Sequence, residues 1–155
     1  MGDVAAVQIT NGDSRVLFQD STSNIVIARV TAPFLSGGTY IGIGPVVPAR
    51  EVLPSTPIVA ITANTATWTA IRIYFLSPAN VLSEYIWAPG GFSGGPSCTR
   101  CLTAQGIVVQ SGKVLYAMAN TEFNQFRVGF VNAGQPTTIS EAENLGGSWG
   151  VATYV

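Results

Sequence analysis

Short apolar runs follow one another along the whole chain, and polar or turn-forming residues separate them. The runs are rich in Val, Ile, Thr, Tyr and Phe, and the breaks between them contain Gly, Pro, Asn and Ser. Helical periodicity is hard to find, so this pattern indicates β-strands. Asn11-Gly12 lies between runs at 5–10 and 14–19 and predicts a hairpin with a type I′ turn. The pattern therefore predicts an all-β protein.

Three of the runs resemble one another and carry an arginine at the second position. They are Ser14–Gln19, Ile71–Leu76 and Phe126–Val131, and their arginines stand 57 and 55 residues apart. Each run follows a strand of small apolar residues, and a third strand comes after it. The small strands cover 5–7, 59–61 and 116–118, and the third strands cover 24–30, 81–87 and 137–143. This repetition predicts three tandem units in a single domain, at about 1–54, 55–112 and 113–155.

A glycine-rich stretch with an aromatic residue continues each unit, at 34–38, 91–95 and 147–150. A less regular fourth strand closes the unit, with 40–43 and 151–154 as candidates. Four short antiparallel strands in roughly 40–55 residues are typical of a propeller blade. Three blades cannot close a ring, because propellers typically have about 4–8 blades. We therefore expect a homodimer with six blades, the alternative being three repeats in another β architecture.

Charged residues make up only 10% of the chain, against about 25% in a typical soluble protein. The net charge is −1 and the basic residues are scattered singly, which excludes a basic footprint for nucleic acid or an anionic membrane. No apolar run approaches the ~20 residues of a membrane-spanning helix, and the N-terminus lacks a signal-peptide layout. We expect a soluble chain, either cytoplasmic or secreted by a non-classical route.

The residues that most often carry catalysis are scarce. The chain has no histidine, the commonest general base and metal ligand. Cys98 and Cys101 are the only cysteines, too few for a zinc site, and no helix beside a parallel sheet supports a redox pair. We expect a loop pair, free or disulfide-bonded, and a non-enzymatic protein without a cofactor or metal.

In their order, the repeats resemble those of the fungal and bacterial fucose-binding lectins of the six-bladed β-propeller type. The second repeat carries the likeness best, in Arg72–Phe75, Val81–Tyr85 and Gly91–Gly95. The resemblance covers nearly the whole chain and implies a non-catalytic lectin for fucosylated glycans. In that family the sugar lies between neighbouring blades. Arginine and glutamate of one blade bind its hydroxyls, and aromatic residues of the next blade pack on its apolar face.

Of the three sites that the resemblance implies, the one that begins in the second repeat is the most complete. It has Arg72 and Glu84, with Trp149 from the third repeat, while Asn144 stands near the family's further aromatic residue. Each of these residues also has a simpler interpretation. Arg72 and Glu84 would make a cross-strand ion pair of little energetic value at the surface, and a glycine-flanked tryptophan often packs in a core.

The site that begins in the third repeat depends on a second chain. It has Arg127 and Glu141, and its aromatic residue would be Phe34 in the first repeat of another chain. Glu141 and Glu143 lie two apart on one strand and face the same way, which suggests the paired carboxylates of a glycosidase. A solvated edge is the commoner explanation for such a pair.

The site that begins in the first repeat has lost its carboxylate. Arg15 is present, Ala28 is expected in place of the glutamate, and Trp87 and Phe92 supply the aromatic residues. This change should weaken or abolish sugar binding there. Together with Phe34, the low charge and a mean hydropathy of +0.36, it favours an alternative function. That alternative is a propeller that binds a small apolar ligand, such as a pigment or another secondary metabolite held as a chromophore.

Overall fold

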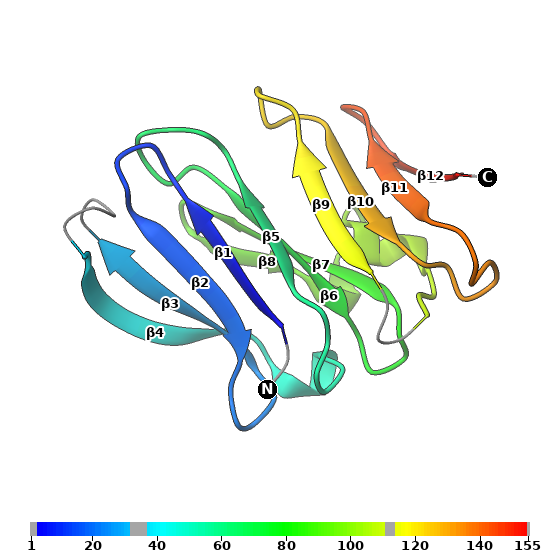
Figure 1. The fold of residues 1–155 in the computed structure, drawn as a ribbon, viewed down its shortest axis with the longest axis horizontal. Coiled ribbons are helices and arrows are strands. Elements are labelled where there is room, and N and C mark those ends of the chain that lie inside the picture. The colour runs from blue at the N-terminus through cyan, green and yellow to red at the C-terminus, as the bar shows by residue number, and fades with distance from the viewer. Residues whose placement is uncertain (1–2, 32–36, 111–113, 155) are drawn as a thin grey trace.

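The structure is a computed structural model, and it describes residues 3–31, 37–110 and 114–154. Three four-stranded antiparallel sheets stand next to one another, each with its strands in chain order (Figure 1). The first contains β1 (Val4–Gln8), β2 (Ser14–Gln19), β3 (Ile25–Thr31) and β4 (Thr39–Val47). The second contains β5 (Val59–Thr62), β6 (Ile71–Leu76), β7 (Leu82–Ala88) and β8 (Gly91–Gly94). The third contains β9 (Leu115–Ala119), β10 (Phe126–Phe130), β11 (Ser140–Asn144) and β12 (Trp149–Thr153). The prediction of three four-stranded blades is confirmed.

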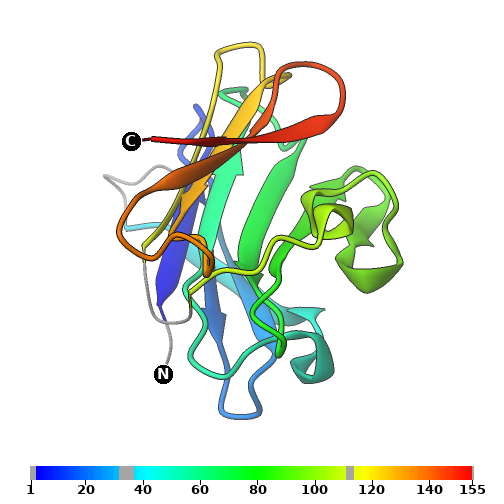
Figure 2. The same cartoon turned by 90° about the vertical axis from the view of Figure 1, so that its right-hand side faces the viewer.

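The first strands of the blades lie side by side, with β5 in contact with both β1 and β9. An alanine occupies the same register in each of them, since Ala6, Ala60 and Ala117 pair with the residue that follows the arginine of the next strand. Small side chains allow the three inner strands to approach closely. The blades then fan out, so that β11 and β12 cross the direction of β1 and β2 at a steep angle (Figure 2).

Apolar side chains fill both spaces between neighbouring blades. Side chains alternate between the two faces of a strand, so β6 in the middle blade contributes to both spaces. Ile73 and Phe75 pack toward the first blade, whereas Tyr74 and Leu76 pack toward the third, and all four are fully buried. The middle blade is therefore covered on both faces.

The first and third blades each have one uncovered face in this chain. Phe75 of β6 and Phe130 of β10 are fully buried against the preceding blade, but Phe18, at the same register in β2, is only partly buried. Val4 lies opposite Phe18 and is exposed, as is Ile43 of β4 on the same face. The outer face of the first blade is apolar.

Two local expectations differ from the structure. In the second and third blades the glycine-rich stretch forms part of the fourth strand, since β8 is Gly91–Gly94 and β12 begins at Trp149, whereas the strand predicted at 40–43 lies within β4, after Gly37 and Gly38. In β8, a Cβ on Gly94 would come within 2.4 Å of the Glu84 carbonyl oxygen, so only glycine allows this close pairing. The hairpin at Asn11-Gly12 exists, but the predicted type I′ turn is wrong, since only Gly12 of the two has a positive φ. The Gly12 N–H donates to the Ile9 carbonyl oxygen, so Thr10 and Asn11 are the central residues of the turn, and the Asn11 side chain accepts a hydrogen bond from the Asp13 N–H.

Replacement of Phe75 by alanine tests the packing between the first two blades. The side chain is fully buried, so Phe75→Ala should lower the free energy of unfolding by about 3–5 kcal/mol, measured by urea denaturation. Val108→Ala, at an exposed valine, is the matched control and should change it by no more than about 0.5 kcal/mol. Equal effects of the two substitutions would contradict this assignment of the core.

Candidate ligand-binding sites between the blades

The strand register decides which residues accompany each arginine. Arg15, Arg72 and Arg127 are the second residues of β2, β6 and β10, and each faces the space that follows its blade. The residue two positions after each arginine pairs with a residue of the third strand on the same face of the sheet, here called the row partner of the arginine. The row partner is Glu84 in the second blade and Glu141 in the third. The corresponding residue of the first blade is Ile27, which lies opposite Leu17. The expectation that Ala28 replaces the glutamate is therefore wrong, because Ala28 pairs with Val16 and faces the opposite side.

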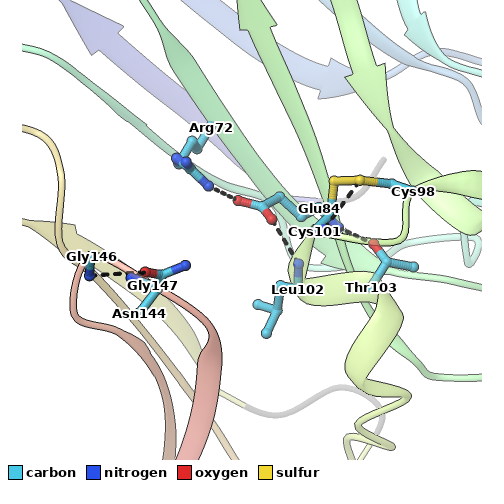
Figure 3. A network of polar contacts seen from close by, with 9 residues as sticks. All are labelled: Arg72, Glu84, Cys98, Cys101, Leu102, Thr103, Asn144, Gly146 and Gly147. Atoms are coloured by element: carbon cyan, nitrogen blue, oxygen red, sulfur yellow. Dashed lines mark hydrogen bonds and ion pairs between the residues drawn. A yellow bond between two sulfur atoms is a disulfide. The ribbon is translucent and has the colours of Figure 1, made fainter.

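Arg72 and Glu84 form a tight pair inside the second blade interface (Figure 3). Arg72 Nη1 donates to Glu84 Oε1 at 2.5 Å, and the glutamate side chain is fully buried. Its other oxygen accepts a hydrogen bond from the backbone N–H of Leu102 at 2.8 Å. Because the carboxylate is buried and satisfied on both oxygens, this is not the exposed ion pair of the simpler interpretation.

The Cys98–Cys101 pair is a disulfide in the loop that covers Glu84. It joins two short 3₁₀ helices, η3 (Gly95–Ser97) and η4 (Leu102–Gln105). Thr103 in η4 accepts the Glu84 backbone N–H through Oγ1 at 2.8 Å, next to the Leu102 contact. The cysteines thus have a structural role beside the arginine–glutamate pair, within the expectation of a loop pair.

The aromatic residue on Arg72 is one that the sequence pattern did not single out. The guanidinium carbon lies 3.8 Å from the centre of the Phe126 ring, and the Arg72 side chain is 19% exposed. Trp149 is 7% exposed and packs edge-on against Tyr74, with 6.4 Å between ring centres. Phe126 immediately precedes Arg127 in the repeat, which is the signal that could have identified it.

Asn144 faces the same space from the third blade (Figure 3). Its Oδ1 accepts hydrogen bonds from the backbone N–H groups of Gly146 and Gly147 at 3.1 and 3.0 Å. These contacts fix the β11–β12 turn opposite Arg72. The second interface therefore offers a fixed guanidinium, a buried carboxylate and a polar turn.

The third arginine stands on the outer face of the last blade. Arg127 is 3.7 Å from Glu141 and 3.6 Å from Glu143, and its side chain is 47% exposed. Glu141 accepts hydrogen bonds from the hydroxyls of Tyr116 and Tyr154. Burial alone would raise the pKa of Glu141, but these two hydrogen bonds and the charge of Arg127 outweigh it and hold the pKa below its ordinary value. Its expected aromatic partner, Phe34, lies outside the described residues.

The first interface contains a cavity of about 280 Å³. Arg15, Trp87 and Phe92, which were predicted together, all line it. The structure adds Arg29 and Trp68, and the guanidinium carbon of Arg15 lies 4.3 Å from the centre of the Trp68 ring. Neither addition was predicted, because Arg29 replaces an uncharged position of the second repeat and Trp68 lies in the β5–β6 connection.

Two further findings concern metal ions and membranes. Within residues 3–31, 37–110 and 114–154, no group of three or more Cys, Asp or Glu side chains is arranged to hold a metal ion. Within the same residues, no helix has the length and apolar character needed to cross a membrane.

Comparison with known proteins identifies the fold. No protein-family model matches the chain, and no curated protein matches its sequence. Among solved structures, AofleA from Arthrobotrys oligospora is 21% identical, with a TM-score of 0.79 over 98% of this chain and 41% of that one. The Aleuria aurantia lectin, a six-bladed β-propeller, is 22% identical, with a TM-score of 0.71 over 97% and 48%. A fucose lectin from Kordia zhangzhouensis is 14% identical, with a TM-score of 0.65 over 99% of both chains.

These similarities show that the three sheets have the fold of blades in a six-bladed β-propeller. The chain spans slightly less than half the length of AofleA and of the Aleuria aurantia lectin, and the full length of the Kordia zhangzhouensis protein.

The pKa of Glu141 provides a test of the cluster on the third blade. Because its pKa in the folded state is lowered, the ionised carboxylate stabilises the fold above the ordinary value of 4.5, and this contribution is lost as pH falls through the lowered pKa. Tyr116→Phe removes one hydrogen bond to the carboxylate and should raise the pKa of Glu141, as followed by carbon-detected NMR titration. Tyr40→Phe, at an exposed tyrosine, should leave it unchanged. A Glu141 that titrates at its ordinary value in the unaltered protein would refute this geometry.

Proposed function

We propose that the protein is a non-catalytic lectin that binds fucosylated glycans between its second and third blades. The observation that carries this proposal is the Arg72–Glu84 pair, in which a buried carboxylate holds a guanidinium against an aromatic ring. Sugar hydroxyls require donors and acceptors in fixed positions, and this arrangement is fixed before any ligand arrives. Nothing in the pair requires activation of a nucleophile or a proton transfer.

The solved structures support the choice of sugar. The Aleuria aurantia lectin is described with a fucose recognition mode, and the Kordia zhangzhouensis lectin was solved with methyl-fucoside. A variant of AofleA with three arginines replaced by alanine has also been solved. The present chain carries three arginines, each at the second residue of the second strand of its blade, and this repetition is the feature of its sequence that most directly suggests a ligand held between blades.

We further propose that two copies of the chain form a six-bladed ring. The outer face of the first blade is apolar and includes Val16 and Phe18, which are only partly buried. The residues at the same positions in the other two blades are fully buried. The outer face of the third blade presents Arg127 and Glu141, which in the second blade have counterparts covered by a neighbour. A second copy would cover both faces by one repeated contact, and Arg127 would then lie at a blade interface as Arg72 does.

Loss of Arg72 should abolish fucose binding at this interface. Arg72→Ala removes the donors and leaves Glu84 buried without its partner, so retention on fucose-agarose should fall sharply, and any retention that remains would come from the proposed site at Arg127. Arg72→Lys keeps the charge but not the fork of donors, and it should reduce retention while the protein still folds, as circular dichroism would verify. Arg50→Ala, at an exposed arginine outside the three interfaces, is the control. Unchanged retention of Arg72→Ala would refute the assignment.

The ring proposal is tested by mass. Light scattering of the unaltered protein should give twice the mass of one chain. Phe18→Asp places a charge on the outer face of the first blade and should give the mass of one chain, because a buried unpaired carboxylate is costly. Val108→Asp introduces the same charge at another exposed position and should remain a dimer. A single-chain mass for the unaltered protein at micromolar concentration would exclude the homodimer.

A further inference from the structure

The cavity between the first and second blades contains two arginines that face each other. Arg15 of β2 and Arg29 of β3 are directly opposite in the antiparallel pairing, so both side chains lie on the same face of the sheet. Like charges in this arrangement are destabilising. Burial lowers the pKa of Arg15, the charge of Asp13 opposes this, and the charge of Arg29 adds to it. Asp13 lies in the β1–β2 turn and is not among the residues that line the cavity.

The other two blades each pair their arginine with a glutamate of the same blade. Glu84 pairs with Arg72, and Glu141 lies beside Arg127. In the first blade the same row carries Ile27, which lines the cavity with an apolar side chain. None of the described residues that line this cavity is acidic, so its two guanidinium groups give it a positive charge.

Aromatic residues form the rest of the recognition surface. The ring of Trp68 packs on the Arg15 guanidinium and limits its movement. Trp87 and Phe92 come from the second blade, are paired in register on β7 and β8, and line the same cavity. Phe92 is 37% exposed, which leaves part of its ring available to a ligand. The volume of about 280 Å³ is near the lower end of ligand pockets, which suits one ring better than a long chain.

We propose that this cavity binds a single sugar ring that carries a negative charge, with its carboxylate or sulfate on Arg15 and Arg29 and its apolar face on Trp87 and Phe92. Guanidinium groups bind planar or branched oxyanions through paired hydrogen bonds. Arg15 donates a hydrogen bond to the Ser14 carbonyl oxygen at 2.9 Å, but a purely apolar occupant would take water from two like-charged guanidinium groups without supplying an anion, so the cavity does not favour an apolar pigment. The sugar in this proposal rests on the proposed lectin function, whereas the negative charge rests on the cavity alone.

Calorimetric titration with glucuronic acid, glucose 6-sulfate and glucose at pH 7 tests the ligand class. At least one of the two acidic sugars should bind about tenfold or more tightly than glucose, and its affinity should fall as salt is added. A preference for glucuronic acid over glucose 6-sulfate, or the reverse, identifies the anion. Equal affinity for all three sugars, or no binding of either acidic sugar, would overturn the proposal. So would binding of indole-3-carboxylate without either acidic sugar, because the ligand would then not be a sugar.

Variants at the cavity locate the site. Arg29→Gln should weaken the acidic sugar about tenfold, and Phe92→Ala should weaken glucuronic acid without removing its salt dependence. Arg50→Gln removes an equal charge elsewhere and should have no effect. Fucose-agarose separates the two functions: Arg29→Gln should retain fucose binding, and Arg72→Lys should retain acidic-sugar binding. If the unaltered protein binds glucuronic acid but is not retained on fucose-agarose, only the assignment of fucose is refuted. If Arg29→Gln binds the acidic sugar as tightly as the unaltered protein does, only the assignment of the acidic sugar to this cavity is refuted.

Discussion

Each blade of this molecule has two faces, and exposure of either face to solvent lowers the stability of the fold. The second strand of a blade sets what those faces contain, because its side chains alternate. On one side come the two apolar residues that pack against the preceding blade, as Ile73 and Phe75 do. On the other side come the arginine and its row partner, which face the following blade. Every inter-blade space is therefore built from an apolar face and a face with a cation at its outer end.

This arrangement explains why much of the fold was predictable. The arginine repeats, the small inner strands and the order of four strands per unit depend on local alternation and on turn residues, which the sequence displays directly. The row partner of Arg15 was harder to predict from the sequence, because a shift of one residue in the strand register exchanges Ile27 and Ala28 between opposite faces of the sheet. Contacts between segments far apart in the chain, such as Arg15 on Trp68 and Arg72 on Phe126, leave no local pattern at all. The burial of Trp149 is another such contact, because it depends on Tyr74, which belongs to another blade.

The two glutamates show how similar rows can be completed by different means. A buried carboxylate must be satisfied by hydrogen bonds, or the pair it forms costs more than it contributes. Glu84 receives a backbone N–H from η4, in a loop closed by the Cys98–Cys101 disulfide. Glu141 instead receives two tyrosine hydroxyls, from β9 and from the chain after β12. In the first blade the problem does not arise, because Ile27 needs no such partners, and none of the described residues that line the cavity beside Arg15 and Arg29 is acidic.

Neutralisation inside the blade also determines what a ligand must bring. Where a glutamate holds the arginine, a neutral molecule with hydroxyl groups can use the remaining donors and acceptors without a change in net charge. In the first blade, Ile27 stands where the other blades have a glutamate, and Arg29 lies directly opposite Arg15. An occupant that supplies a negative charge is therefore favoured there. Arg127 shows the remaining case, since its glutamates are present but no blade covers it, and its side chain stays 47% exposed against 19% for Arg72. In the proposed ring, a neighbouring blade would remove water from Arg127 and strengthen its attraction to Glu141, so closure of that ring would also cover the third arginine.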